Sequence, residues 1–329
     1  MKRGPFTLIL LGVLLLSLFL SVRLGHVSLT SGEAWRALTG GGDPVHRRIL
    51  LEIRLPRAFL GLLVGGGLAL AGSVFQALLR NPLAEPYILG ISGGSAAGAV
   101  LVLSLGWVTL SSGLLPAAAF TGALLAVLLV FRVAASADRR LDVRVLLLAG
   151  VVVGSFFTAV IALILSLSEA QAVRSAILWM MGSLSGATWG SVGVVASYTL
   201  PSSVVLMALA RALNLMSIGE ETAGYLGTDV ERVKRIAYGV ASLITAAGVA
   251  VAGIIGFVGL IVPHTLRLIV GSDQRTLLPL SFLAGAAFLT LADLGARLIL
   301  DPTEIPIGVI TAFLGVPLFL VLLRRSLSE

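Results

Sequence analysis

The sequence has no cysteine and only three histidines among its 329 residues. Without cysteine, the chain can form no disulfide, no thiol nucleophile and no thiolate metal site. The histidines, His26, His46 and His264, are too few and too scattered along the chain to predict a metal site. We therefore expect neither a resident metal nor a cofactor.

Charge is also scarce. Charged residues make up 12% of the chain, whereas soluble domains carry about 25%. The mean hydropathy is +1.06, and long apolar runs recur, each close to the roughly 20 residues that cross the hydrocarbon core of a bilayer as a helix. The alternating polarity of membrane-spanning strands is absent. The sequence therefore predicts an all-α, polytopic membrane protein.

Several kinds of functional site are missing. The only lysines are Lys2 and Lys234, and neither follows a glycine, so the chain has no phosphate-binding P-loop of its own. Paired acids and a Ser/His/Asp set are absent too, which argues against an intramembrane enzyme. The apolar runs contain almost no acidic residues, which argues against a proton- or sodium-coupled secondary transporter. That last class would transport in liposomes from this chain alone, driven by an ion gradient, and stays as a less favoured alternative.

We expect one transmembrane domain over residues 1–329, with about ten spans. The expected spans are 4–22, 58–79, 92–110, 114–133, 145–167, 191–210, 236–256, 258–271, 277–296 and 307–323. The run 258–271 is short and contains Pro263, so it needs protein neighbours to cross. A short helix is expected within the connection 166–190.

The basic residues predict an orientation. When the spans alternate from a cytoplasmic N-terminus, the cytoplasmic side receives most of the 23 basic residues, as the positive-inside rule requires. This assignment also places the C-terminus in the cytoplasm, the polar segment 24–57 outside and the segment 211–235 inside. The net charge of +7 is thereby explained by basic loops, and no nucleic-acid partner is expected.

The segment 211–235 is a charged island between two apolar runs. Its glutamates Glu220 and Glu221 suit the first turn of a helix over about 218–226, where the helix dipole favours anions. Gly227 can end that helix in a left-handed conformation, and Thr228 or Asp229 can cap the next one. A pair between Glu231 and Arg235 would support the second helix. The pattern predicts a compact helix–turn–helix rather than an ordinary loop.

Several motifs in order resemble the FecCD-type permeases, the membrane subunits of type II ABC importers for iron-siderophores, haem and cobalamin. The motifs are RLPR at 54–57, GGGLALAG at 65–72 with Gln76, RNPLAEP at 80–86, LGISGG at 89–94, WMMGSL at 179–184, GFVGLIVPH at 256–264, IPIG at 305–308 and GVP at 315–317. The resemblance covers the chain from about residue 50. Each motif alone is weak, whereas the ordered set is specific.

The resemblance implies partners and localisation. The chain would be a permease, not an enzyme, forming a homodimer in a bacterial or archaeal cytoplasmic membrane. Two separate ATPase subunits would hydrolyse ATP, and a soluble periplasmic or lipid-anchored binding protein would deliver the substrate. The expected cargo is a bulky metal chelate, with iron-siderophore or haem favoured and cobalamin as the alternative.

The resemblance also assigns roles to residues. Arg54, Arg57 and Arg297 would dock the binding protein, because guanidinium groups grip carboxylates with two hydrogen bonds. Anchoring of Arg54 and Arg57 by snorkelling to the interface is the alternative. The segment inserted into the ATPase would comprise Ser217, Ile218, Gly219, Glu220, Glu221, Thr222, Ala223, Gly224, Tyr225, Leu226 and Gly227. The substrate pathway would include Ser166, Ser168, Met180, Met181, Gly182 and Ser183, although the two methionines are equally compatible with packing.

Overall fold

The computed structural model describes residues 3–25, 27, 29–137 and 142–327. Lys2 and His26, named above, lie outside these ranges. All regular structure within the described ranges is helical. In chain order the α-helices are α1 (Arg3–Arg23), α2 (Ser31–Leu38), α3 (Pro44–Arg48), α4 (Leu55–Leu78), α5 (Ile91–Ser104), α6 (Leu114–Ala137), α7 (Val143–Ser166), α8 (Ala170–Met180), α9 (Trp189–Ala208), α10 (Ala210–Ile218), α11 (Glu220–Tyr225), α12 (Val230–Ala252), α13 (Val258–Val270), α14 (Gln274–Leu298) and α15 (Ile307–Leu327). A π-helical turn, Ile49–Arg54, joins α3 to α4, and 3-10 turns lie at Pro86–Leu89 and Trp107–Thr109.

The expected spans are found. Within the described residues, seven helices are long and apolar enough to cross a membrane, namely α1, α4 with the turns before it, α6, α7, α9, α12 and α14. Three shorter apolar helices, α5, α13 and α15, correspond to the remaining expected spans. The chain is therefore a multi-pass, all-α membrane protein, and its seven candidate spans and three shorter apolar helices approximate the predicted count of about ten.

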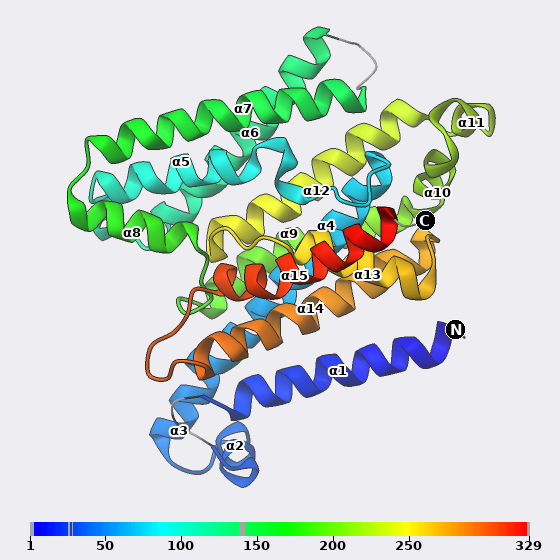
Figure 1. Ribbon diagram of the computed structural model, residues 1–329. Coiled ribbons are helices and arrows are strands. Elements are labelled where there is room, and N and C mark those ends of the chain that lie inside the picture. Colours follow the sequence, from blue (N-terminus) through cyan, green and yellow to red (C-terminus); the bar gives the residue numbers. More distant parts are fainter. Residues whose placement is uncertain (1–2, 26, 28, 138–141, 328–329) are drawn as a thin grey trace.

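Helix α4 forms the centre of the bundle and is buried along nearly its whole length. It packs against α14, α12, α13 and α9, while α1 lies along the outer side of α14 (Figure 1). At two points its backbone touches a neighbour directly: Gly65 against Gly285 of α14, and Gly72 against Gly259 of α13, with no room for a Cβ at either. Small residues at such crossings allow the close approach on which helix association in lipid depends.

A second layer consists of α5, α6 and α7, which pack on one another beside the central group (Figure 1). The helix α7 leaves one face uncovered, with Leu148, Val151, Val152, Phe156 and Leu163 exposed. The predicted short helix in the connection 166–190 is α8, which packs against α5.

The start of α1, the end of α15 and α11 lie at one end of the bundle, and α2 and α3 lie at the other (Figure 1). We call these the α11 end and the α2–α3 end. The connection 299–306 between α14 and α15 also lies at the α2–α3 end (Figure 1). The two groups of charged residues described next lie at opposite ends.

Two expected spans have wrong boundaries. The span predicted over 92–110 is α5, which ends at Ser104. The span predicted over 236–256 is α12, which begins at Val230 and ends at Ala252. Gly253 has a positive φ of 71° and packs against the carbonyl of Trp179 and the backbone of Gly182. The chain then runs without helix to Val258, so a non-helical stretch, 253–257, separates α12 from α13.

Candidate functional site

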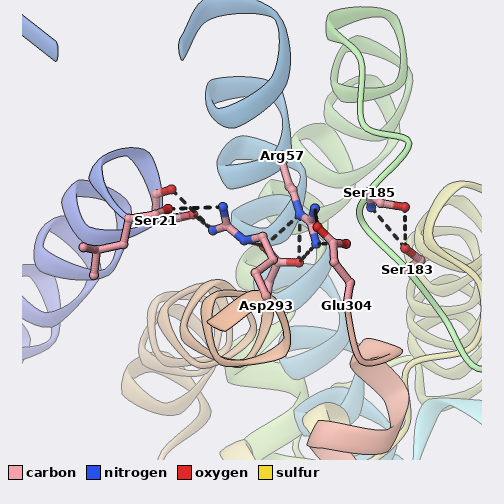
Figure 2. Close-up of polar contacts among 8 residues, drawn as sticks. Ser21, Arg57, Ser183, Ser185, Asp293 and Glu304 are labelled. Carbon is pink, nitrogen blue, oxygen red and sulfur yellow. Dashed lines mark hydrogen bonds and ion pairs between the residues drawn. The ribbon is translucent and has the colours of Figure 1, made fainter. Parts of the chain in front are cut away.

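The charged group at the α2–α3 end consists of Arg57, Asp293, Arg297 and Glu304, which we call the arginine cluster. Arg57 is in the first turn of α4, where its Nε and Nη2 donate to the Asp293 carboxylate of α14 at 2.9–3.0 Å. Its Nη1 and Nη2 donate to the two oxygens of Glu304 at 2.8 and 3.0 Å. The guanidinium of Arg57 is thus gripped along two edges by carboxylates from two elements (Figure 2).

Asp293 is shared with a second arginine. Arg297, one turn further along α14, places its Nε 3.2 Å from Asp293 Oδ2 in an i, i+4 ion pair. Its Nη2 also donates to the Ser21 hydroxyl of α1 at 2.9 Å (Figure 2). The cluster therefore links α1, α4, α14 and the connection 299–306.

Arg54 is close in sequence but has different partners. It donates to the backbone carbonyls of Val22 and Arg23 at 2.9 Å, and to that of Val27. Cations are favourable at a helix C-terminus, because the last carbonyls of the helix have no intrahelical partner. Arg54 therefore caps the end of α1.

The three arginines predicted to dock a binding protein are thus buried and hydrogen-bonded within the chain. Arg57 and Arg297 meet on one carboxylate, whereas Arg54 does not join them. Docking by these residues stays a prediction. Sequence reasoning missed Glu304, which lies on an irregular connection where no helical spacing pointed to Arg57.

The charged island 211–235 folds into three helical pieces, α10, α11 and the start of α12. Gly219 separates α10 from α11, and Gly227 takes a positive φ of 84°, as predicted. Asp229 caps α12 by accepting from the Arg232 amide at 3.1 Å. The apolar side chains of Ile218, Tyr225 and Leu226 are exposed, Tyr225 to 92%.

Beneath α11 lies a second charged group, Lys234, Glu220, Glu231 and Arg80, which we call the lysine cluster. The Lys234 ammonium is 1% exposed, 2.5 Å from a Glu220 oxygen and 3.6 Å from Glu231. Arg80, in the hairpin after α4, lies 3.8 Å from the other Glu220 oxygen. The predicted pair of Glu231 with Arg235 is wrong: the carboxylate faces Lys234, and Arg235 donates to the backbone carbonyl of Glu231.

The α11 end is also tied to α14. The Asn214 amide of α10 donates to Asp273, the N-cap of α14, at 2.8 Å. The Asn214 oxygen accepts from the Gln274 amide at 2.8 Å. A movement of α10 and α11 can therefore be transmitted through direct contacts to α4, α12 and α14.

The predicted pathway residues fall into separate cavities. Met180 and Met181 line a cavity of about 580 Å³, which we call the α8–α15 cavity, together with Ile254, Gly256, Phe257, Gly308, Val309, Ala312, Phe313, Val316 and Pro317. Gly182 and Ser183 line a smaller cavity of about 180 Å³ beside the arginine cluster. Ser168 bonds to Ser104 in a third cavity, and Ser166 bonds to the backbone of its own helix.

The non-helical stretch 253–257 is held by the hairpin between α4 and α5. The Glu85 carboxylate accepts from the Phe257 amide at 2.7 Å, and the Tyr87 hydroxyl donates to the Ile255 carbonyl at 3.0 Å. Burial raises the pKa of Glu85, and the Phe257 amide partly opposes that rise. Burial likewise raises the pKa of Tyr87. These bonds fix backbone that lines the α8–α15 cavity.

Comparison with known proteins identifies the scaffold. Residues 13–325 match the FecCD transport family. The chain is 44% identical to the cobalamin import system permease protein BtuC of Halobacterium salinarum, over 90% of this chain and 80% of that one. It is 38% identical to the hemin transport system permease protein HmuU of Yersinia pestis, over 98% and 96%.

Two solved structures share the fold of this chain. A metal-chelate type ABC transporter in an inward-facing conformation superposes with a TM-score of 0.88 at 32% identity, covering 98% of this chain and 99% of that one. PsaBC from Streptococcus pneumoniae shares the fold, with a TM-score of 0.57 at 18% identity.

Proposed function

The chain belongs to the FecCD transport family of ABC transporter permeases, and from that premise we propose that it is the membrane subunit of an ATP-driven importer of a bulky metal chelate. It works as a homodimer with two ATPase subunits and one substrate-binding protein. The α11 end faces the cytoplasm, with both termini, and the α2–α3 end faces outward, in a bacterial or archaeal cytoplasmic membrane.

The observation that carries this proposal is the surface of α11. Tyr225, Ile218 and Leu226 expose large apolar groups at the end of the bundle that also carries the charged residues of the island. Below them is a polar cavity of about 990 Å³, whose lining includes Arg80, Asp142, Arg144, Glu220, Glu221 and Glu231. A central apolar anchor with a polar rim is the usual anatomy of a protein–protein interface. We assign this surface, residues 217–227, to the ATPase subunit.

The cargo is a metal chelate. Relatives named for hemin and for cobalamin are similar to this chain along most of its length, and both of those cargoes are bulky metal-containing macrocycles. The α8–α15 cavity is lined mainly by apolar side chains, including Met180, Met181 and Phe313, which suits the apolar faces of such a chelate. Iron-siderophore and haem are the favoured cargoes, and cobalamin is the alternative.

The second copy would cover the exposed face of α7. Leu148, Val152 and Phe156 form an apolar stripe there. Substrate would pass along the axis between the two copies, past α7 and the α8–α15 cavity. A heterodimer with a related permease would use the same surface.

The proposal is tested by purifying the tagged chain from its native membrane and identifying what co-purifies. ATPase and binding-protein subunits are expected, and the purified complex should take up one of hemin, cobalamin or a ferric siderophore into ATP-loaded proteoliposomes. Uptake by the chain alone under an ion gradient would overturn the proposal.

A variant tests the α11 surface. Tyr225→Ala should weaken ATPase-subunit association at least tenfold, because truncating an interface anchor typically costs more than about 1.4 kcal/mol. Val45→Ala, an exposed apolar residue at the α2–α3 end, is the matched control and should leave association unchanged.

A further inference from the structure

The arginine cluster contains one carboxylate unlike the rest. Arg57, Asp293 and Arg297 belong to helices and are buried, whereas Glu304 is on the connection 299–306 and is 31% exposed. Asp293 contacts both arginines, and Glu304 bonds to Arg57. Because Glu304 is partly exposed and lies outside the helices, it is the member that can leave without moving a helix.

Its departure would expose a complete carboxylate-binding edge. Glu304 occupies the Nη1–Nη2 edge of the Arg57 guanidinium with two hydrogen bonds, while Asp293 holds the Nε–Nη2 edge. A planar guanidinium can bind a carboxylate on each edge. Another carboxylate can take the Nη1–Nη2 edge only when Glu304 is displaced.

Charge favours replacement over simple addition. Two arginines and two carboxylates make the cluster neutral, so a third carboxylate would add an uncompensated buried charge. If Glu304 moves into water as the new carboxylate arrives, the buried charge stays the same. The cavity of about 180 Å³ lined by Arg57, Glu304, Ser183 and Ser185 provides space next to that edge. The side chains of these four residues are drawn in Figure 2.

The connection that carries Glu304 leads directly to the α8–α15 cavity. Three residues on, the Ile307 amide donates to the Gly182 carbonyl at 3.2 Å, and the next amide, of Gly308, donates to the Met181 carbonyl at 3.0 Å. Met181 and Gly308 both line the α8–α15 cavity. Displacement of Glu304 would therefore pull on the bonds that hold the start of α15 against the end of α8.

We propose that Glu304 occupies on Arg57 the place that a carboxylate of the binding protein takes on docking, so that docking exchanges one carboxylate for the other and releases the start of α15. This inference rests on the proposed function, since it requires a binding protein at the α2–α3 end. Docking on Arg57 then involves competition between an internal and an external carboxylate.

Competition predicts the sign of a mutational effect. Glu304→Gln keeps the size of the side chain and removes its charge, so Arg57 is more often free for the partner. If Glu304 is released about one tenth of the time in the wild type, the apparent affinity for the binding protein should rise by up to roughly tenfold. A purely structural Glu304 would give the opposite sign or no change.

The experiment uses the transporter in nanodiscs and the substrate-free binding protein that co-purifies with it. The dissociation constant is measured for the wild type, for Glu304→Gln and for Glu52→Gln, an exposed carboxylate at the same end that pairs with Arg48. Tighter docking for Glu304→Gln alone supports the exchange. Weaker or unchanged docking by a folded Glu304→Gln transporter overturns it.

A second measurement does not depend on that variant folding. Because the chain has no cysteine, the pair Ser185→Cys and Ile305→Cys, both lining the small cavity, can be joined by a short bismaleimide. Docking should lower the yield several-fold, and an unchanged yield in the docked state overturns the exchange. If no binding protein docks on the wild type, the proposed function fails instead, so the two failures are distinguishable.

Discussion

The arginine cluster and the lysine cluster both stabilise a buried cation, but they do so with different carboxylate partners. Each places a buried cation at one end of the bundle, and each uses a partly exposed glutamate, Glu304 or Glu220, as a partner. In the arginine cluster a fully buried carboxylate, Asp293, is shared by two guanidinium groups. In the lysine cluster both carboxylates that face Lys234 retain contact with solvent.

This difference predicts that the two clusters behave differently when helices move. Removing a buried charge partner leaves the other charge uncompensated, so the arginine cluster should be sensitive to any change in Asp293. An ammonium is a compact point charge that accepts many geometries, so Lys234 can keep its contacts as the partly exposed Glu220 and Glu231 shift. We expect the arginine cluster to hold helices in place and the lysine cluster to allow movement of α11.

The largest effect is expected at Asp293. Asp293→Asn removes the charge shared by Arg57 and Arg297, and should lower the free energy of unfolding by about 3–5 kcal/mol. Thermal unfolding of the purified protein in one detergent measures this loss. Glu304→Gln, at the exposed edge of the same cluster, should cost clearly less, and equal losses would contradict the distinction between the two carboxylates.

Arg57→Lys should come next. A lysine keeps the charge but cannot form two-pronged bonds with both carboxylates, so we expect a loss of about 1.5–3 kcal/mol, the size of a hydrogen bond to a charged group. The same unfolding assay applies. A lysine that stabilises as well as arginine would show that charge alone, and not the fork geometry, holds the cluster.

A smaller stability effect is expected at Lys234. Lys234→Met replaces the buried ammonium with an apolar chain of similar length. Because Glu220 and Glu231 are partly exposed, water can solvate the carboxylates that lose their partner, and we expect a loss of about 1 kcal/mol. We expect the functional effect to be larger, with substrate-stimulated ATP hydrolysis reduced several-fold in the reconstituted complex. Arg235→Met, at an exposed neighbouring position, is the control. A large loss of stability in Lys234→Met would show that the lysine cluster also holds helices in place.

The smallest effect concerns Glu85, a buried carboxylate bonded to a backbone amide. Because burial raises its pKa in the folded protein, the folded state holds that proton more tightly than the unfolded state does. Its contribution to stability is therefore present at low pH and falls as the pH rises from the ordinary pKa of a glutamate through the raised one. Glu85→Gln should flatten this part of the pH–stability curve, and an unchanged slope would contradict the assignment.

The features that the sequence predicts correctly depend on residues that are close together along the chain. The apolar spans, the cap at Asp229 and the turn at Gly227 all follow from patterns within one helix or one turn. The failure at Glu231 is also local: Lys234 and Arg235 are both within reach of it, and spacing alone does not show which one faces the bundle.

The remaining contacts join distant parts of the chain. Arg57 meets Asp293 across 236 positions and Glu304 across 247, and no periodicity links them. The end of α12 at Gly253 was missed for a similar reason, because the helix stops where its backbone meets Trp179 and Gly182. Such contacts depend on how helices pack, which spacing along one segment does not specify.

The direct backbone contacts of α4 have a mechanical consequence. Gly65 on Gly285 and Gly72 on Gly259 leave no side-chain layer to deform, so α4, α13 and α14 should move as one rigid body. A 24-residue helix spans about 36 Å, so a tilt imposed on that body near α11 arrives undiminished near Arg57. The connection 299–306 is then the natural hinge, where rotation of this body becomes opening or closing of the path between α8 and α15.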